Sequence, residues 1–482
     1  MSPFGTIRVD CLQTFDYTGN DLRTQEDSSK RRHDLIKAPL DPARAAAFAH
    51  LATLAHGCPD LFPLDLDQTG LNRRQTAFAS AIVDLTCRRW LTLRWLIEQH
   101  LTKPFTQLQP ELGGVLLAGA SQLLFLDGVP AYAAINESVE WAKQTIRPGA
   151  GGLANAVLRR IADLVGDPIE RVPEWTMARN EIPLADGTAI VLKSNIMPEE
   201  ERMRFGIATS CPSAVFNSML GFLDEERVRE IALHNMAPAP TVLNIEHSLA
   251  STDIPDLDPH ETTGFAVYRG NHRGLLQLLD SSDDIWVQDS ASAKGVHLAA
   301  QACPSPGLIL DLCAGRGTKT RQLAAVFPDA KIIATDTNDY RRETLRSVFQ
   351  WHDRVGVMNP EEMHCWLGQA DMILLDVPCT NTGTLARRVE ARYRATDTTV
   401  AALVTVQRQI IANTLPMLAK GGTLVYSTCS LDPRENNQQA LWAAKQHRLR
   451  ITHEQTTLPE GLPGESHTRY CDGSYTATLT AE

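Results

Sequence analysis

Hydrophobic positions recur at spacings of three and four residues through most of residues 41–165, which is the period of an amphipathic helix. Phe48 and Ala52 belong to the first such run, and Asp41-Pro42 before it supplies an N-cap and a proline suited to a first helical turn. We therefore predict a small all-α bundle. Its further helices are expected over residues 73–99, 110–126, 133–145 and 153–164, with a chain break at 148–152.

A different pattern begins near residue 284, where short continuous apolar runs alternate with helical segments. Uninterrupted apolar strands separated by helices are typical of a doubly wound parallel sheet that is buried on both faces. We therefore predict an α/β, Rossmann-like domain over residues 284–482. Its main strands are expected at residues 308–312, 331–334, 372–375 and 423–427.

The remaining segments have weaker patterns. Residues 166–240 are interpreted as a helical linker region, in which the acidic run from Asp224 opens a helix that ends near His234. Residues 241–283 contain strand-like pieces between turns and predict a small α+β subdomain. Residues 1–40 are polar and irregular, so we expect a disordered leader. The chain is thus predicted to be multidomain.

Composition narrows the class of protein. With 43% hydrophobic and 21% charged residues, the chain reads as globular. No apolar run is long enough to span a bilayer and the polar N-terminus has no signal-peptide core, so we expect a cytoplasmic protein without membrane contact. The 10 cysteines are scattered with no CxxC pair, which argues against a zinc site.

The net charge of -11 argues against non-specific binding of nucleic acid, but arginines are clustered locally. The first cluster fits a solvated helical face and an RNA contact equally well. The second directly follows a candidate active-site cysteine, which favours contacts with phosphates. The two clusters are Arg73, Arg74, Arg88, Arg89 and Arg94, and then Arg387, Arg388, Arg392 and Arg394.

A glycine-containing loop follows the first predicted strand of the α/β domain. Small residues let the backbone approach a ligand, and Asp336 lies about 20 residues further on, where it can bind ribose hydroxyls. By itself the loop also fits a tight structural turn. A nicotinamide dehydrogenase is disfavoured because Thr320 breaks the GxGxxG pattern. The candidate cofactor-binding residues of the loop are Cys313, Ala314, Gly315, Arg316, Gly317, Thr318 and Lys319.

Two cysteines follow the ends of two later strands. Cys379 stands in DVPCTNTG after Asp376, and Cys429 stands in YSTCSLDPREN. Parallel strands deliver their ends to one edge of the sheet, so both thiols can face one cleft, although two buried packing cysteines are the alternative. A thiolate beside a nucleotide-like cofactor suggests covalent attack on carbon 6 of a pyrimidine. Asp376 can orient the base or contact the cofactor.

These motifs resemble those of the Sun/NOP-type RNA 5-methylcytosine methyltransferases, in which DLCAGRGTKT corresponds to a DLCAAPGGKT loop; the segment VQDSAS also resembles that family. The resemblance implies S-adenosylmethionine as cofactor, Cys429 as nucleophile and Cys379 as the residue that assists release, with Asp376 and Lys319 at other active-site positions. Arg316 and Thr318 depart from the family's proline and glycine. A GD pair that contacts adenine is also missing, and Asn359 stands in that region.

A second resemblance covers most of residues 41–165. The segments SQLLFLD, PAYAAINE and NAVLR look like a NusB-type RNA-binding domain, which occurs fused to certain ribosomal RNA methyltransferases. Together the resemblances imply a monomer that methylates carbon 5 of a cytosine in ribosomal RNA, with 16S rRNA or an assembling small subunit as partner. The alternatives are a transfer RNA substrate, or a catalytically impaired RNA-binding or assembly protein on the same scaffold.

Overall fold

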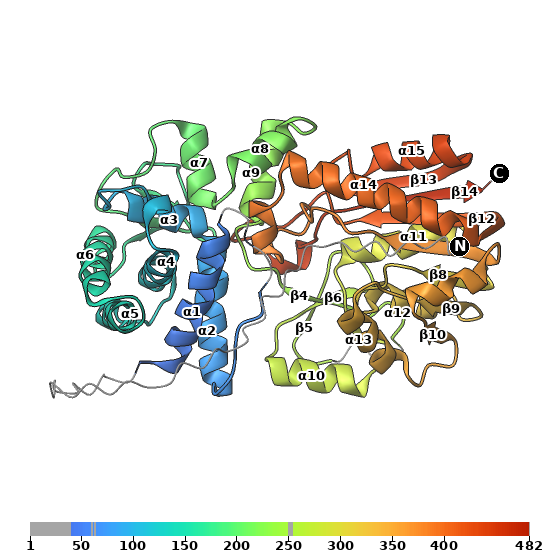
Figure 1. Ribbon diagram of the computed structural model, residues 1–482, viewed down its shortest axis with the longest axis horizontal. Coiled ribbons are helices and arrows are strands. Elements are labelled where there is room, and N and C mark those ends of the chain that lie inside the picture. Colours follow the sequence, from blue (N-terminus) through green and yellow to red (C-terminus); the bar gives the residue numbers. More distant parts are fainter. Residues whose placement is uncertain (1–39, 59–60, 62–63, 249–253, 482) are drawn as a thin grey trace, which may run out of the picture. The chain divides into compact units, whose positions relative to one another are not determined.

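The computed structural model describes residues 40–58, 61, 64–248 and 254–481 (Figure 1). The leader predicted over residues 1–40 lies outside the described residues apart from Leu40. The first described part is helical. It contains α1 (Pro42–Gly57), α2 (Arg73–Arg88), α3 (Trp90–Glu98), α4 (Pro110–Phe125), α5 (Ala131–Thr145) and α6 (Pro148–Val165), with a short 3-10 turn, η1, at Phe105–Gln107.

Two helix boundaries differ from the prediction. The expected break at 148–152 is wrong because Pro148 begins α6, where a missing N–H costs nothing and the fixed φ angle suits the first turn. The helix expected over 73–99 is interrupted at Arg89, whose φ and ψ of -112° and 17° separate α2 from α3. Neither proline nor glycine marks that break in the sequence.

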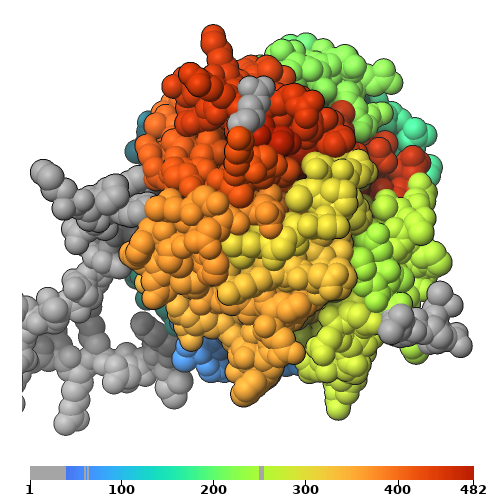
Figure 2. All heavy atoms as spheres, turned by 90° about the vertical axis from the view of Figure 1, so that its right-hand side faces the viewer, coloured from blue at the N-terminus to red at the C-terminus, as the bar shows by residue number. Residues whose placement is uncertain are grey.

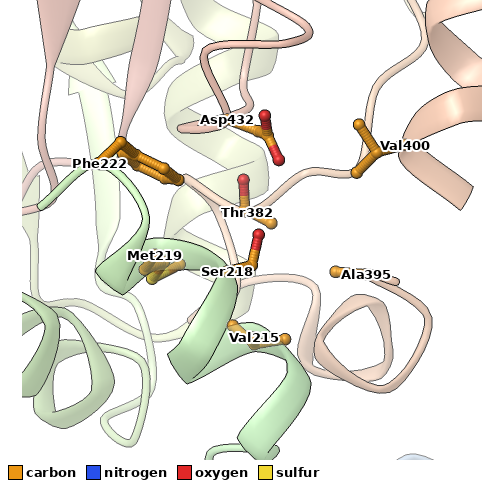
Figure 3. A pocket seen from close by; sticks show the side chains of 8 residues that line it. All are labelled: Val215, Ser218, Met219, Phe222, Thr382, Ala395, Val400 and Asp432. Carbon is orange, nitrogen blue, oxygen red and sulfur yellow. The ribbon is translucent and has the colours of Figure 1, made fainter. Parts of the chain in front are cut away.

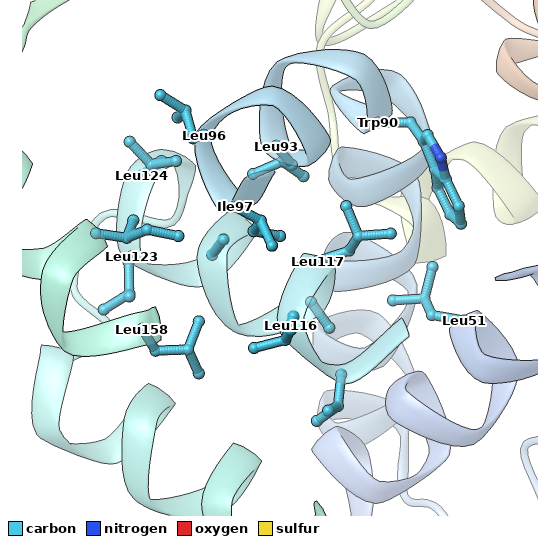
Figure 4. Packing of buried hydrophobic residues seen from close by; sticks show 14 of the residues in the cluster. Leu51, Trp90, Leu93, Leu96, Ile97, Leu116, Leu117, Leu123, Leu124 and Leu158 are labelled. Carbon is cyan, nitrogen blue, oxygen red and sulfur yellow. The ribbon is translucent and has the colours of Figure 1, made fainter. Parts of the chain in front are cut away.

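Apolar side chains of α1, α3 and α4 form the core of this helical part (Figure 4). Leu51, Leu93 and Leu116 are fully buried, and α4 is buried on nearly all sides from Leu112 to Leu124. A Cβ at Gly114 would lie only 2.6 Å from the Ala52 nitrogen, so this glycine allows α4 to approach α1 closely.

Residues 166–240 are more than the expected helical linker. They begin with a three-stranded antiparallel sheet in the order β1-β3-β2 and continue with three helices. Strands of two or three residues are too short to show a readable alternation, which is why the sequence pattern missed them. The elements are β1 (Arg171–Val172), β2 (Glu181–Pro183), β3 (Ala189–Val191), α7 (Glu201–Thr209), α8 (Ser213–Leu220) and α9 (Glu225–His234).

A four-stranded antiparallel sheet comes next, in the order β5-β6-β4-β7. Its last strand, β7 (Trp286–Val287), belongs to the chain beyond residue 283 and ties the small subdomain to the C-terminal part. The other elements are β4 (Thr241–Asn244), β5 (Leu257–Pro259), β6 (Phe265–Tyr268) and α10 (His272–Ser281).

The C-terminal part is built on a seven-stranded sheet in the order β10-β9-β8-β11-β12-β14-β13. The first five strands of this order run parallel, and β14 and β13 are antiparallel additions at one edge. The strands are β8 (Leu308–Asp311), β9 (Lys331–Ala334), β10 (Val355–Val357), β11 (Ala370–Asp376), β12 (Leu418–Thr428), β13 (Leu449–Thr457) and β14 (Ser474–Ala481). This is the predicted Rossmann-like fold.

Helices cover both faces of this sheet because alternate residues of each buried strand point to opposite sides. On one face, Ile309, Met372 and Leu374 pack with α11 (Ser290–Ala302), α12 (Thr318–Val326) and α13 (Asp339–Phe349). On the other, Leu310 and Ile373 pack with α14 (Asp397–Thr414) and α15 (Asn437–His447). Short 3-10 turns η2 (Pro360–Trp366), η3 (Val389–Tyr393), η4 (Leu415–Met417) and η5 (His467–Arg469) complete the part. The space-filling view shows one face of this C-terminal part, in yellow, orange and red (Figure 2).

Candidate active site

The candidate site lies at the carboxyl ends of the central parallel strands. β8 pairs with β9 on one side and with β11 on the other, so the connections after β8 and β11 leave the sheet at a point where the strand order reverses. Open α/β sheets bind ligands at such a point. β11 and β12 pair in register from Met372 to Asp376, which brings the two cysteine motifs after them side by side.

The loop after β8 depends on its two glycines. Gly315 and Gly317 have φ of 59° and 92°, in the region that favours glycine. A Cβ at Gly317 would lie 2.7 Å from the Phe349 ring, whereas one at Gly315 would meet nothing within 4 Å. The loop is therefore packed against α13 at Gly317 and open at Gly315, as close approach of a ligand to the backbone requires.

Asp336 joins this loop to the end of β9. Its carboxylate accepts hydrogen bonds from the Gly315 N–H at 3.0 Å and the Asn338 N–H at 2.8 Å. A carboxylate has further lone pairs, so ribose hydroxyls can still donate to it. The loop, the open space at Gly315 and the acidic group therefore fit the nucleoside part of a cofactor.

The structure also shows the surroundings of the other predicted residues of this loop. Arg316 and Thr318 are exposed, so neither departure from the family's pattern fills the loop. Burial raises the pKa of Cys313. Ala314 donates its N–H to the Thr335 carbonyl at 3.0 Å. Asn359 is the N-cap residue of η2. Its side-chain Oδ1 accepts a hydrogen bond from the Arg346 guanidinium at 2.7 Å, so this oxygen already has a partner.

Lys319 in the first turn of α12 and Asp376 at the end of β11 form an ion pair. The Lys319 Nζ lies 2.7 Å from Asp376 Oδ2, and the lysine side chain is largely buried. Burial lowers the pKa of Lys319, but the Asp376 carboxylate outweighs it and the net pKa is raised. The ammonium is therefore held charged at the end of β11.

The two predicted cysteines meet. Cys379 Sγ lies 3.4 Å from Cys429 Sγ. The hydrogen bond from Cys379 lowers the pKa of Cys429 and outweighs the effect of burial, whereas the same bond raises the pKa of Cys379. Cys429 Sγ donates to Oδ1 of Asn381, which has φ of 59°, at 3.2 Å, a bond that requires the Cys429 thiol. The bond between the two sulfurs favours a thiolate on Cys429 and a thiol on Cys379.

Three residues that the sequence analysis did not single out belong to this site. Asn381 and Thr384 contact the Cys429 sulfur, and Glu435 is hydrogen-bonded to the residues directly after both cysteines. Asn381 lies inside DVPCTNTG, Thr384 directly follows that string, and Glu435 lies inside YSTCSLDPREN. Their position in or beside these motifs was the available signal.

The segment after Cys379 also packs against α8. A small pocket there is lined by Val215, Ser218 and Met219 of α8 together with Thr382 and Asp432 (Figure 3). None of the predicted catalytic or cofactor-binding residues lines it. We therefore interpret it as a packing gap behind the active-site segment.

Each arginine cluster differs in part from its expected role, although Arg73 and Arg74 are exposed, as a solvated helical face requires. Arg88 and Arg89 are 4% and 2% exposed, so neither lies on a solvated face. Arg392 is buried and donates to backbone carbonyls, including those of Asn235 at 2.7 Å and Leu385 at 3.2 Å. Arg387 pairs with Asp289 and Asp472 at 3.0 and 2.6 Å. Arg88, Arg89 and Arg392 hold segments together and are not free for phosphates, whereas Arg387 is exposed but pairs with two carboxylates.

Two further observations concern the described residues as a whole. They contain no group of three or more histidine, cysteine or acidic side chains arranged to hold a metal ion. No helix in the described ranges has the length and apolarity needed to cross a membrane.

The sheet, with its glycine loop and the acidic residue after the second parallel strand, is typical of Rossmann-like methyltransferases. Residues 301–479 match the family model described as 16S rRNA methyltransferase RsmB/F, and residues 13–163 match the NusB family. The chain therefore contains a domain similar to the RsmB/F methyltransferases, which follows a domain similar to the NusB family. S-adenosylmethionine is the cofactor of this class.

Relatives cover most of the chain. It is 27% identical over 427 residues to ribosomal RNA small subunit methyltransferase B of Yersinia enterocolitica, a match that spans 86% of this chain and 92% of the relative. The protein of the same name from Yersinia pestis is also 27% identical, over 428 residues. A crystal structure of PH0851 superposes with a TM-score of 0.62 at 18% identity and covers 92% of this chain and 99% of that one, which shows the shared fold.

Proposed function

We propose that this protein methylates carbon 5 of a cytosine in 16S rRNA through a covalent adduct between Cys429 and carbon 6 of the base. The observation that carries the proposal is the 3.4 Å approach of the Cys379 and Cys429 sulfurs beside the Lys319–Asp376 pair. The substrate is supported by the names of the curated relatives, ribosomal RNA small subunit methyltransferase B.

The residues that would hold the cofactor are the 313–319 loop, Asp336 for the ribose hydroxyls and Asp376 near the methionine end. When bound, S-adenosylmethionine supplies a methyl group on an electrophilic sulfonium. The open backbone at Gly315 and the carboxylate of Asp336 support this placement.

The Cys429 thiolate attacks carbon 6 and forms the S–C6 bond, and the electron pair of the C5–C6 double bond moves so that carbon 5 becomes nucleophilic. The Lys319–Asp376 pair is near enough to orient the ring and to balance the charge that develops on it. Carbon 5 accepts the methyl group. A base then removes the carbon-5 proton, the double bond re-forms, and the S–C6 bond breaks to return the Cys429 thiolate. Cys379 assists this release.

We propose that residues 41–165, with their NusB-like helices, position the RNA, while residues 284–482 carry out the chemistry. The target base must leave its stack to reach the sulfurs, which favours a single-stranded or junction site. Arg388 stays a predicted phosphate contact. It is exposed, and its N–H donates to the Thr384 carbonyl at 2.9 Å one turn away, so it lies beside a residue that contacts Cys429.

The test uses 16S rRNA transcript or immature small subunits, labelled S-adenosylmethionine, and the wild type beside Cys429→Ala and Cys379→Ala. We expect methyl transfer to one cytosine by the wild type, none by Cys429→Ala, and a denaturation-resistant protein–RNA adduct with Cys379→Ala. Cys471→Ala is a matched control because Cys471 is also buried but lies outside the site. An adduct that persists in Cys429→Ala would assign the nucleophile to another residue.

The alternative is a catalytically impaired RNA-binding or assembly protein, motivated by Arg316, Thr318 and the missing adenine-contacting aspartate. A calorimetric titration with S-adenosylmethionine separates the two. Binding by the wild type supports the enzyme. No binding, together with no labelled RNA, supports the assembly protein.

A further inference from the structure

The Glu435 side chain lies buried between the two cysteine motifs. It is 0% exposed and accepts hydrogen bonds from four donor groups. The Thr380 N–H and the Gln407 Nε2 amide donate to Oε1 at 3.0 Å each, and the Ser430 hydroxyl donates to Oε2 at 2.6 Å. The Thr380 hydroxyl is the fourth donor. Burial raises the pKa of Glu435, and the hydrogen bonds from Ser430, Thr380 and Gln407 oppose this rise by stabilising the carboxylate.

These hydrogen bonds link one carboxylate to the residue that follows each of the two cysteines. Thr380 directly follows Cys379, and Ser430 directly follows Cys429. Gln407, held by Glu435, also donates to the carbonyl of Pro378 at 3.0 Å, so Cys379 is fixed from both sides. A shift of Glu435 would therefore move the two sulfurs relative to each other.

The charge of Glu435 also acts unequally on the two thiols. It raises the pKa of Cys379, after the larger effects of the bond to Cys429 and of burial. The largest influences on the pKa of Cys429 are the bond to Cys379, burial, Asp376, Arg388 and Thr384. The other charged or titratable groups that face the two sulfurs are Asp376, Lys319, Arg388 and Tyr426.

We propose that Glu435 is a positioning residue for the reaction: it fixes the two sulfurs against each other and directs their shared proton to Cys379, so that Cys429 is the nucleophile. The inference rests on the proposed function, in which Cys429 attacks the base. Without this carboxylate two neighbouring thiols would compete for the same role.

The test compares wild type with Glu435→Gln, which keeps the shape of the side chain and removes its charge. Each protein is treated briefly with iodoacetamide between pH 6 and 9 without RNA or cofactor, and peptide mass spectrometry gives the ratio of label on Cys429 to label on Cys379. We expect Cys429 to dominate in wild type. In Glu435→Gln the ratio should fall about tenfold, equivalent to one pKa unit.

Glu181→Gln is the matched control. Glu181 is also buried, and it accepts from the N–H and hydroxyl of Thr176, but it touches neither cysteine motif. Its labelling ratio should equal that of wild type. If Glu435→Gln also keeps the wild-type ratio, the proton-directing role is overturned, whatever happens to activity.

Thr380→Val tests the geometric role and serves if Glu435→Gln does not fold. It removes one hydroxyl donor and keeps the carboxylate, so we expect the wild-type labelling ratio with methyl transfer several-fold slower. Methyl transfer at the wild-type rate would overturn the role in fixing the sulfurs. If wild type labels Cys429 selectively but methylates no RNA, the proposed function fails while the inference about Glu435 stands.

Discussion

Arg392 provides the sharpest test of how the active-site segment is held. The residue is 3% exposed, and its guanidinium donates to the carbonyls of Asn235 at 2.7 Å and Leu385 at 3.2 Å. The carbonyls of Arg88 and Ser210 lie at 3.3 and 3.5 Å. These carbonyls come from four separate stretches of chain. The arginine therefore connects α2 and the ends of α7 and α9 to the segment after Cys379.

We predict that Arg392→Met destabilises the protein by about 3 kcal/mol. Two well-formed bonds from a charged donor contribute roughly 1.5–3 kcal/mol each, and their removal leaves buried carbonyls without partners. Part of that loss is offset because burial of the guanidinium is itself unfavourable, as the lowered pKa of Arg392 indicates. For a chain of this length, about 3 kcal/mol corresponds to a fall of roughly 3 °C in Tm if unfolding is a single transition.

The measurement is a calorimetric Tm together with RNA affinity at several salt concentrations. Arg394→Met is the control, because Arg394 lies nearby but is partly exposed, and its ion pair with Glu390 is long, at 3.8 Å. The Tm of Arg394→Met should therefore stay within about 1 °C of wild type. RNA affinity of Arg392→Met should keep the wild-type salt dependence. An unchanged Tm with a shallower salt dependence would refute the structural role and restore the phosphate contact expected from sequence.

Two further predictions concern charge. Arg388→Gln should weaken RNA binding and reduce the slope of log affinity against log salt by about 0.7–0.9, the effect of one lost phosphate contact, as measured by filter binding. The same change should raise the pKa of Cys429, because Arg388 lowers it, and the pH profile of iodoacetamide labelling measures this rise. Burial raises the pKa of Asp311 to about 7, so the folded protein binds the proton of this carboxyl more tightly than the unfolded chain does. The stability that the protonated Asp311 contributes is therefore present below about pH 4 and lost as the pH rises to about 7. The Tm of wild type relative to Asp311→Asn should therefore fall across this window, and a difference that is constant from pH 4 to 8 would contradict the assignment.

Local sequence patterns predicted much of the secondary structure and part of the candidate site. The period of the apolar positions identified the helices of residues 42–165, and uninterrupted apolar runs identified β8, β9, β11 and β12, because both signals arise from short-range geometry of the chain. Strand ends placed Cys379 and Cys429 on one edge of a sheet, since parallel strands share that edge. The family resemblance, confirmed by the RsmB/F and NusB matches, rested on contiguous strings of residues.

Only the tertiary structure decided what the individual charged side chains do. Arg388 and Arg392 stand four residues apart in one basic run, yet one is exposed beside the sulfurs and the other is buried among carbonyls from distant segments. In the same way, the partners of Glu435 come from three places in the chain. Burial and hydrogen bonding depend on contacts between residues far apart in sequence, and a local pattern carries no record of them.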